Sequence, residues 1–359
     1  MSAELLRHLR DQFAFDDAPR RHDLAAYHVP FDVLAPGGPS PERTLAAATR
    51  RGERLVVEGS SGRGKSSLLA SVLGEDAEGV VPFLVPMSAE PAETVTEPRA
   101  MAVHLVQTIV AAAKRAEVLR GSEDEALREA TPTRVVGRDQ LTGRVGVTLG
   151  VVAAELGRQA AGGDSMPRSA TAIFEVVHQL LVTIATERVM PVLVFDDTDR
   201  WLGTAFDEPE RLVRAFFGKV LLQLRDFPCS LVVAVHPRYR QRPEVSASID
   251  RVLTTRIDLP PLPDFDAVAR LLARRIEAHV EADPDPGRWH GSSVSDVLAP
   301  AAVERLFEHY RRGLGNELRT VVRTVHVALA TACDGGAELI TVEMIDASVA
   351  SWSDAGPGS

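Results

Sequence analysis

The residues with the clearest chemical signature lie between Gly59 and Ser66, where the chain reads GSSGRGKS. This octapeptide matches the pattern G-x-x-x-x-G-K-[ST] without interruption. Glycines let such a loop turn so that its backbone N–H groups point inward at phosphate oxygens. The ammonium group of Lys65 can reach the β- and γ-phosphates of a nucleotide, and the Ser66 hydroxyl can coordinate Mg²⁺. The stretch therefore predicts a nucleotide-binding P-loop.

The sequence on either side of this loop has the pattern that a P-loop requires. Residues 55–57 form a short apolar run typical of a buried strand, and residues 67–72 continue as a helix. Such a helix offers its positive N-terminal end to the bound phosphate. The alternative, a Gly/Ser-rich surface loop, is disfavoured by this context. The residues expected to bind the nucleotide are Gly59, Ser60, Ser61, Gly62, Arg63, Gly64, Lys65, Ser66 and Ser67.

A second chemical signal is the pair of carboxylates Asp196 and Asp197, which directly follows the apolar run 191–195. The carboxyl ends of parallel strands face the ligand crevice in open α/β sheets. Nucleotide hydrolysis needs a carboxylate near Mg²⁺ and a group that orients or deprotonates the attacking water. We expect Asp196 to hold Mg²⁺, directly or through water, and Asp197 to act as the base. The alternative is a strand end followed by a turn, with no chemical role.

The elements that must position these residues alternate along the chain between positions 53 and 259. Continuous apolar strands separated by helices are typical of a parallel sheet covered on both faces. The predicted fold class is therefore α/β: a P-loop NTPase core with a parallel sheet, followed by a small C-terminal helical lid. Strands are expected at 55–57, 80–86, 191–195 and 230–235, and helices at 41–51, 101–117, 170–188 and 207–225.

The predicted domain order has four parts. An N-terminal helix and Pro/Gly-rich linker occupy 1–40, the ATPase core 41–262, a lid of four amphipathic helices 263–352, and a polar tail 353–359. Within the core, residues 118–168 are first acidic and then Gly-rich. In one stretch of this segment, RVGVTLG, the residue types alternate as they do in the strands of a β-hairpin. We interpret residues 118–168 as an insertion, which either packs on the core as a hairpin or protrudes to bind a partner.

Composition narrows the class of protein. The 359 residues are 45% hydrophobic and 25% charged, which is ordinary for a globular protein, and the net charge of −10 gives no global attraction for nucleic acid or anionic membranes. Cys229 and Cys333 are far apart and lack metal-ligand spacing. No apolar run approaches the ~20 residues that span a bilayer, and the charged N-terminus is unlike a signal peptide. We expect a cytoplasmic protein that does not bind membranes, from a GC-rich bacterial genome.

With both motifs in place, the chain resembles an AAA+ ATPase, close to the initiator/origin-recognition branch and to the STAND signalling ATPases. The resemblance rests on the Walker A motif at 59–66 and the Walker B motif at 191–197, and it covers residues 25–352. It implies ATP and Mg²⁺ as ligands. It also implies an oligomer with ATP at subunit interfaces.

Three further segments match the order of this family's motifs. His236 follows the strand SLVVAV, where the family has its sensor 1 residue. Residues 248–262 resemble the arginine-finger segment, which makes Arg256 the finger, with Arg251 as its neighbour. Residues 313–323 resemble the sensor 2 motif, which makes Arg319 the sensor. Arg323 is the reserve for that role. The alternative for Arg256 is an arginine whose stem packs at a strand edge.

The chain also departs from the family pattern. Asp196-Asp197 replaces the usual Asp-Glu pair, and the shorter Asp197 reaches the attacking water less well, so we expect slow turnover that suits a timed switch. Histidine is unusual at sensor 1, so His236 either donates a hydrogen bond to the γ-phosphate or is a satisfied strand-end residue. The sensor 2 motif is one residue longer than usual, which weakens the case for Arg319.

Two functions fit these features, and fold alone does not choose between them. The first is an ATP-dependent regulatory switch that forms a homo-oligomer or engages a protein partner or effector. The second is a DNA-associated initiator or loader, which the family resemblance and the basic run 238–242 (RYRQR) favour. That run could equally be a solvated loop or a phosphate contact within the chain. A small-molecule kinase fits less well because it would need neither the helical lid nor the finger segment.

Overall fold

The computed structural model describes residues 2–16, 19, 21–74, 77–87, 92–115, 169–185, 189–202, 209–312 and 317–353. The expected insertion at 118–168, the start of the sensor 2 motif at 313–316 and the tail after residue 353 lie outside the described residues. The chain forms two compact units. The first unit comprises Met1–Thr44, Gly59–Gly74 and Asp258–Ser359, and the second comprises Leu45–Glu58 and Glu75–Ile257.

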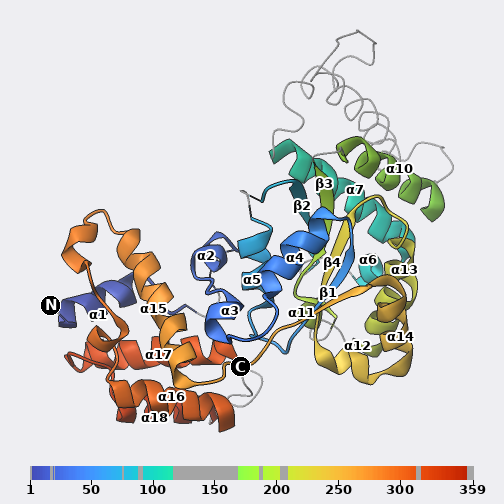
Figure 1. Cartoon of the computed structure of the whole chain (residues 1–359). Coiled ribbons are helices and arrows are strands. Elements are labelled where there is room, and N and C mark those ends of the chain that lie inside the picture. Colours follow the sequence, from blue (N-terminus) through green and yellow to red (C-terminus); the bar gives the residue numbers. More distant parts are fainter. Residues whose placement is uncertain are drawn as a thin grey trace, which may run out of the picture. The chain divides into compact units, whose positions relative to one another are not determined.

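A five-stranded sheet with the order β2-β3-β4-β1-β5 organises the second unit (Figure 1). Its pairs β1–β4, β3–β4 and β2–β3 are parallel. The predicted α/β fold with a parallel sheet and C-terminal helices is confirmed. The strands are β1 (Arg54–Glu58), β2 (Val80–Leu84), β3 (Met190–Phe195), β4 (Ser230–Val235) and β5 (Thr255–Asp258).

The apolar runs of the sequence became the central strands because both of their faces are buried. All of β4 is buried, and so are the last five residues of β3 and the last four of β1. β5 was not predicted as a strand. Only Ile257 of its four residues is buried, which is how an edge strand with one covered face differs from a central one.

Helices of the second unit pack on this sheet and on one another. The predicted helix 207–225 is interrupted by a π-helical turn at Phe216–Val220, where Phe216, Phe217 and Val220 enter the core. In chain order these helices are α4 (Pro41–Arg50), whose first four residues belong to the first unit, α6 (Ala92–Thr96), α7 (Pro98–Arg115), α10 (Ala170–Ile184), α11 (Thr198–Trp201), α12 (Pro209–Ala215), α13 (Leu221–Gln223) and α14 (Pro243–Val252).

The first unit is helical and groups N-terminal residues with the predicted lid. The described residues among 1–40 form three helices where one was expected: α1 (Ser2–Asp11), α2 (Arg21–Ala26) and α3 (Phe31–Leu34). α1 packs on α17, α2 on α5 and α3 on α15. The other helices of this unit are α5 (Lys65–Val72), α15 (Phe265–Glu281), α16 (Pro300–Arg312), α17 (Leu318–Asp334) and α18 (Val342–Ser353).

Buried Arg275 on α15 fixes the N-terminal segment to the lid helices. Its guanidinium donates to the carbonyls of Ala14 at 3.1 Å and Asp16 at 3.0 Å, and lies 4.6 Å from the ring centroid of Tyr27. A buried arginine needs such acceptors, since an unpaired charge in the interior is costly. The N-terminal residues are therefore an integral part of the first unit. The predicted boundaries at 40, 262 and 352 follow chain order and remain predictions.

Candidate functional site

The P-loop follows β1 and leads into α5, with glycines in the conformation that only glycine adopts readily. Gly62 has φ +66° and Gly64 has φ +92°. A Cβ atom on Gly62 would also come within 3.1 Å of the Arg319 Cβ and 3.2 Å of the Glu317 Cβ. Position 62 thus favours glycine for two reasons: its backbone has a positive φ, and a Cβ atom there would crowd Arg319 and Glu317.

The Lys65 side chain folds back onto the start of the loop. Only 5% of the residue is exposed, and its Nζ donates to the carbonyl oxygens of Gly59 at 2.8 Å and Ser60 at 3.0 Å. The ammonium group therefore lies among the backbone atoms that begin the phosphate-binding motif. Its role as the phosphate-binding lysine remains a prediction.

The surroundings of the Arg63 side chain indicate whether the loop can bind an anion. Its Nε donates to the Ser60 hydroxyl at 3.4 Å, but one guanidinium nitrogen is buried and has no hydrogen-bond partner among the described residues. A buried donor without an acceptor is costly, and a phosphate oxygen is the kind of acceptor that would satisfy it. The residues present therefore fit a phosphate group: two cationic side chains and a glycine-rich backbone lie within one octapeptide.

The start of α17 contacts this loop inside the first unit. The Leu318 N–H donates to the Gly62 carbonyl at 2.9 Å, and the Arg319 backbone nitrogen lies 3.3 Å from the position of a Cβ on Gly62. A Cβ on Gly64 would lie 3.5 Å from the Phe31 ring and 3.6 Å from the Leu318 side chain. The structure thus brings the candidate sensor 2 residue, Arg319, to the P-loop. Its side chain is exposed.

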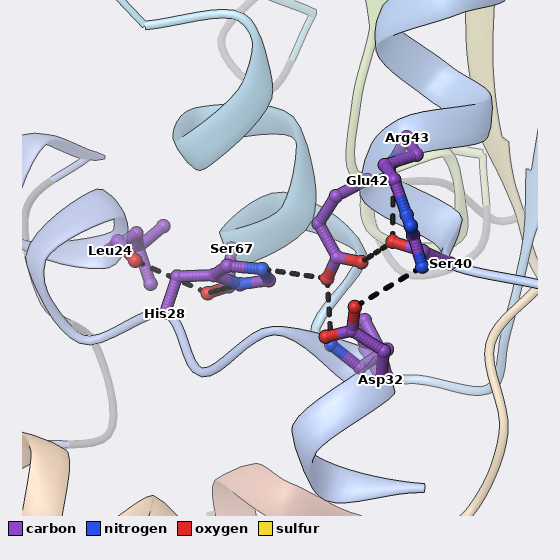
Figure 2. Close-up of polar contacts among 8 residues, drawn as sticks. Leu24, His28, Asp32, Ser40, Glu42, Arg43 and Ser67 are labelled. Atoms are coloured by element: carbon purple, nitrogen blue, oxygen red, sulfur yellow. Dashed lines mark hydrogen bonds and ion pairs between the residues drawn. The ribbon is translucent and has the colours of Figure 1, made fainter. Parts of the chain in front are cut away.

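A polar network that the sequence analysis missed holds the first turn of α5 (Figure 2). The Ser67 hydroxyl donates to the Leu24 carbonyl at 3.2 Å and lies 3.1 Å from the His28 Nδ1 atom. The other ring nitrogen of His28, Nε2, is 2.9 Å from the Glu42 Oε1 atom. The His28 side chain is 5% exposed and that of Glu42 is 16% exposed. Three segments from separate parts of the sequence therefore meet at this histidine.

Glu42 is a strong acceptor in this network. It accepts from the backbone N–H of Phe31 at 2.8 Å and from the Ser40 hydroxyl at 2.8 Å, besides its contact with His28. Burial by itself would raise the pKa of Glu42, but the hydrogen bonds from His28, Phe31 and Ser40 outweigh it and lower the pKa to about 2. Glu42 is therefore a carboxylate at any ordinary pH, and it can only accept.

The second unit carries the candidate Walker B carboxylates at the end of β3. Asp197 has φ +52°, an uncommon conformation that Asp tolerates better than most residues. Its N–H donates to the Asp196 Oδ1 atom at 2.8 Å, while the Trp201 indole N–H donates to the Asp196 carbonyl at 2.7 Å. These contacts turn the chain sharply after the strand and hold the Asp196 carboxylate. Strained backbone of this kind is common at functional sites.

His236 follows the adjacent strand, β4. Its Nδ1 accepts a hydrogen bond from the Arg238 N–H at 3.1 Å and so caps a short helical turn. In the neutral ring the proton is then on Nε2, which is a donor. The two strand ends are tied together where the Thr198 hydroxyl donates to the Ala234 carbonyl at 2.5 Å. The predicted sensor 1 and Walker B residues thus follow neighbouring strands of one sheet.

A buried carboxylate, Glu58, ends β1 immediately before the P-loop, and the sequence analysis did not identify it. Its side chain is 3% exposed and pairs with two arginines. One is Arg240, which also pairs with Asp250 at 2.5 Å. The other is the candidate finger Arg256, whose guanidinium lies 3.0 Å from Glu58 and whose side chain is 52% exposed. In the single chain, Arg256 is therefore held by Glu58.

The basic run 238–242 is engaged within the chain. Arg238 donates to the Asp199 carbonyl at 3.3 Å, and Arg242 lies 3.4 Å from a Glu210 oxygen. Arg240 makes the ion pairs with Glu58 and Asp250. Each arginine of the run thus has an acceptor in its own chain, although one buried guanidinium nitrogen of Arg242 has no hydrogen-bond partner among the described residues.

Two absences bear on ligands. In the described part of the chain, no cluster of three or more His, Cys, Asp or Glu side chains could hold a metal ion. Mg²⁺ usually binds through one or two protein groups and the phosphates of its nucleotide, so Ser66 and Asp196 do not need to form such a cluster. Across those same residues, no helix has the length and apolar character to cross a membrane.

Comparison with known proteins adds little to this geometry. The chain is similar to a chain in a solved structure of Drosophila ORC bound to DNA, at 13% sequence identity and a TM-score of 0.45. The similarity covers 94% of this chain and 67% of that chain. No protein-family model and no curated protein matches the sequence. The fold assignment therefore rests on the strand order and on the P-loop between β1 and α5.

Proposed function

We propose that the protein is a Mg-ATP-binding, slowly hydrolysing ATPase of AAA+/STAND type that acts as a nucleotide-dependent regulatory switch. The observation that carries this proposal is the unbroken Walker A octapeptide after β1, with Gly62 and Gly64 in left-handed conformations and Lys65 buried at the loop. A loop built in this way presents backbone N–H groups and an ammonium to phosphate oxygens.

The proposed chemistry assigns a role to each candidate residue. Lys65 and the loop N–H groups bind the β- and γ-phosphates, while Ser66 and Asp196 hold Mg²⁺, which neutralises charge on the phosphates when bound. Asp197 orients or deprotonates the attacking water, and the Nε2–H of His236 donates toward the γ-phosphate. The short Asp197 side chain supports slow turnover.

The contact between α17 and the loop supports a switch. Because the Leu318 N–H binds the Gly62 carbonyl, a change in the loop on nucleotide binding changes the support of the helix that carries Arg319. A ligand shifts a conformational equilibrium only through contacts that differ between the two states, and in our proposal this hydrogen bond is one that nucleotide binding changes.

We further propose a homo-oligomer in which Arg256 reaches the nucleotide of a neighbouring subunit. Its charge would offset the charge that develops on the γ-phosphate in the transition state. The half-exposed side chain supports this role, and Glu58 would have to release it. A protein partner or effector would recognise the assembled oligomer.

The DNA-associated initiator or loader has weaker support. DNA binding draws on arginines that can pair with phosphates. The arginines of the run 238–242 already have partners in the chain, and the net charge is −10. The regulatory switch is therefore the function we favour.

The first test is the Lys65→Ala variant, which removes the ammonium that would bind the β- and γ-phosphates. We expect the affinity for Mg-ATP, measured by calorimetry, to fall by about 100-fold or more, since charge-assisted hydrogen bonds contribute about 1.5–3 kcal/mol each. Lys219→Ala is the matched control, because Lys219 is exposed and lies outside the P-loop. Unchanged ATP affinity in Lys65→Ala would refute the P-loop assignment.

A further inference from the structure

The hydrogen bonds between Leu24, Ser67 and His28 have defined donors and acceptors. The Leu24 carbonyl only accepts, so the single hydrogen of the Ser67 hydroxyl is donated to it at 3.2 Å. The Ser67 oxygen is then left to accept from the His28 Nδ1–H, which lies 3.1 Å away. His28 therefore acts on Ser67 as a donor.

The second ring nitrogen of His28 faces an acceptor as well. Glu42 Oε1, 2.9 Å from Nε2, belongs to a carboxylate that also receives the Phe31 N–H and the Ser40 hydroxyl. Both ring nitrogens of His28 thus lie within hydrogen-bond distance of an oxygen atom. The two hydrogen bonds on opposite sides of the ring fix its orientation.

This arrangement connects the N-terminal segment with the P-loop at two points. Ser67 lies in the first turn of α5, directly after Ser66, and Phe31 lies 3.5 Å from the position of a Cβ on Gly64. His28 and Glu42 hold the segment between these two points. Figure 2 shows His28 between Ser67 on one side and Glu42 on the other.

A buried polar contact adds little net stability to a fold, because it replaces hydrogen bonds that the same groups make with water. It is a good way to fix direction, because each hydrogen bond has a narrow geometry. Here the group whose direction is fixed is the hydroxyl of the residue that follows the candidate Mg²⁺ ligand. The network therefore fits a role in positioning.

We propose that His28 is a positioning residue for nucleotide binding: held by Glu42, it fixes Ser67 and thereby the first turn of α5, which carries Lys65 and Ser66. The inference rests on the proposed function, since it assigns the His28 network to the same phosphate site. His28 itself touches no nucleotide in this proposal.

The test is a double-mutant cycle on Mg-ATP affinity, with His28→Ala, Ser67→Ala and the double variant. We expect each single variant to weaken binding by about 10-fold, the upper range for one hydrogen bond. We expect the double variant to be no weaker than the weaker single variant, because both changes remove the same contact. Fully multiplied effects would overturn the proposal.

Two conservative variants separate the contacts of the ring. Asn at position 28 can place its amide near the location of Nδ1 and donate to Ser67, whereas Gln reaches toward Glu42. We expect His28→Asn to retain affinity within about 3-fold of wild type, since it keeps one hydrogen bond to Ser67. We expect His28→Gln to behave like His28→Ala. The opposite order would overturn the assignment of Ser67 as the target.

The matched control is His309→Ala. His309 pairs with Asp346 at 2.5 Å on the lid helices, so this variant also loses a histidine–carboxylate pair. We expect it to change the thermal midpoint and to leave ATP affinity unchanged. If His28→Ala does the same, His28 is only structural and the proposal fails. If Lys65→Ala retains ATP affinity, the proposed function fails instead. Should His28→Ala not fold, Ser67→Ala and His28→Asn decide the question.

Discussion

The two cationic side chains of the P-loop are prepared for a phosphate in different ways. Lys65 has acceptors in the Gly59 and Ser60 carbonyls, so it exchanges one set of hydrogen bonds for another on binding. Arg63 has a buried nitrogen without an acceptor among the described residues, so it gains a hydrogen bond. In our proposal, Lys65 therefore positions the phosphate. The new hydrogen bond from the buried Arg63 nitrogen to a phosphate oxygen increases the affinity.

Asp197 is the residue on which the proposed hydrolysis depends. Asp197→Asn removes the proton acceptor and keeps the shape, and Asn tolerates the left-handed backbone as well as Asp does. We expect phosphate release to fall by about 100-fold or more, the usual contribution of a general base, with ATP affinity retained. Asp197→Glu should raise the rate, because its carboxylate reaches one methylene further.

Asp199→Asn serves as the control for this prediction, since it makes the same chemical change two residues further along. Steady-state phosphate release and calorimetric ATP binding would be measured for all three variants. If Asp197→Asn turned over at the wild-type rate, the base would be another residue.

Sequence reasoning identified residues whose chemistry is local and missed those whose role depends on distant partners. The P-loop and the Asp196-Asp197 pair are visible because neighbouring residues define them. Glu58 reads as the polar end of a strand, and its partner Arg240 comes 182 residues later. His28 likewise lies in no motif, and its role is visible only once Glu42 and Ser67 are beside it.

At the scale of elements, the same distinction separates central strands from edge strands. The runs that became β1, β3 and β4 are apolar throughout because both faces are buried, so their pattern is strong. β5 has one buried residue, and the strand forms because β1 offers it a hydrogen-bonding edge. The helix at 207–225 was predicted as continuous, and the π-helical turn within it is a packing adjustment that periodicity does not reveal.

The docking of α17 on the P-loop can be tested with a pair of glycines. Gly62→Ala places a methyl group 3.1 Å from the Arg319 Cβ at φ +66°, whereas Gly336→Ala has nearly the same φ of +65° and nothing within 4 Å. Both variants should lose about 1–2 kcal/mol of unfolding free energy from the backbone alone. Only Gly62→Ala should lose more than this and also bind ATP at least about 10-fold more weakly, since its neighbours must move.

Urea unfolding and ATP titration of the two glycine variants would measure these effects. Equal stability losses with unchanged ATP affinity would mean that the contact between α17 and the loop does not matter for binding.

At the scale of the whole chain, the compact units do not follow the order of the predicted domains. The P-loop and α5 group with the N-terminal and C-terminal helices, while β1, which precedes the loop directly, groups with the sheet. Chain order could not predict this, because the grouping depends on contacts of residues 1–44 and 258–359 with α5 and with one another. In our proposal, nucleotide binding at the loop acts on residues from both ends of the sequence.

The proposed oligomer is the property on which the switch depends, and Arg256 is its critical residue. We expect light scattering to show a defined oligomer with a non-hydrolysable ATP analogue, and smaller species with ADP or no nucleotide. The reason is that the γ-phosphate offers Arg256 a partner of higher charge than Glu58, whose surroundings already include Arg240. Arg256→Ala should bind the analogue with unchanged affinity and remain small.

Arg251→Ala is the matched control for this prediction, because Arg251 is an exposed arginine on α14, close in sequence, with no role in the proposed interface. It should assemble like the wild type. If the wild type stayed a monomer in all three nucleotide states, Arg256 would remain bound to Glu58 and self-assembly could not complete the site. A partner protein would then have to supply the missing charge, and the switch would depend on that partner.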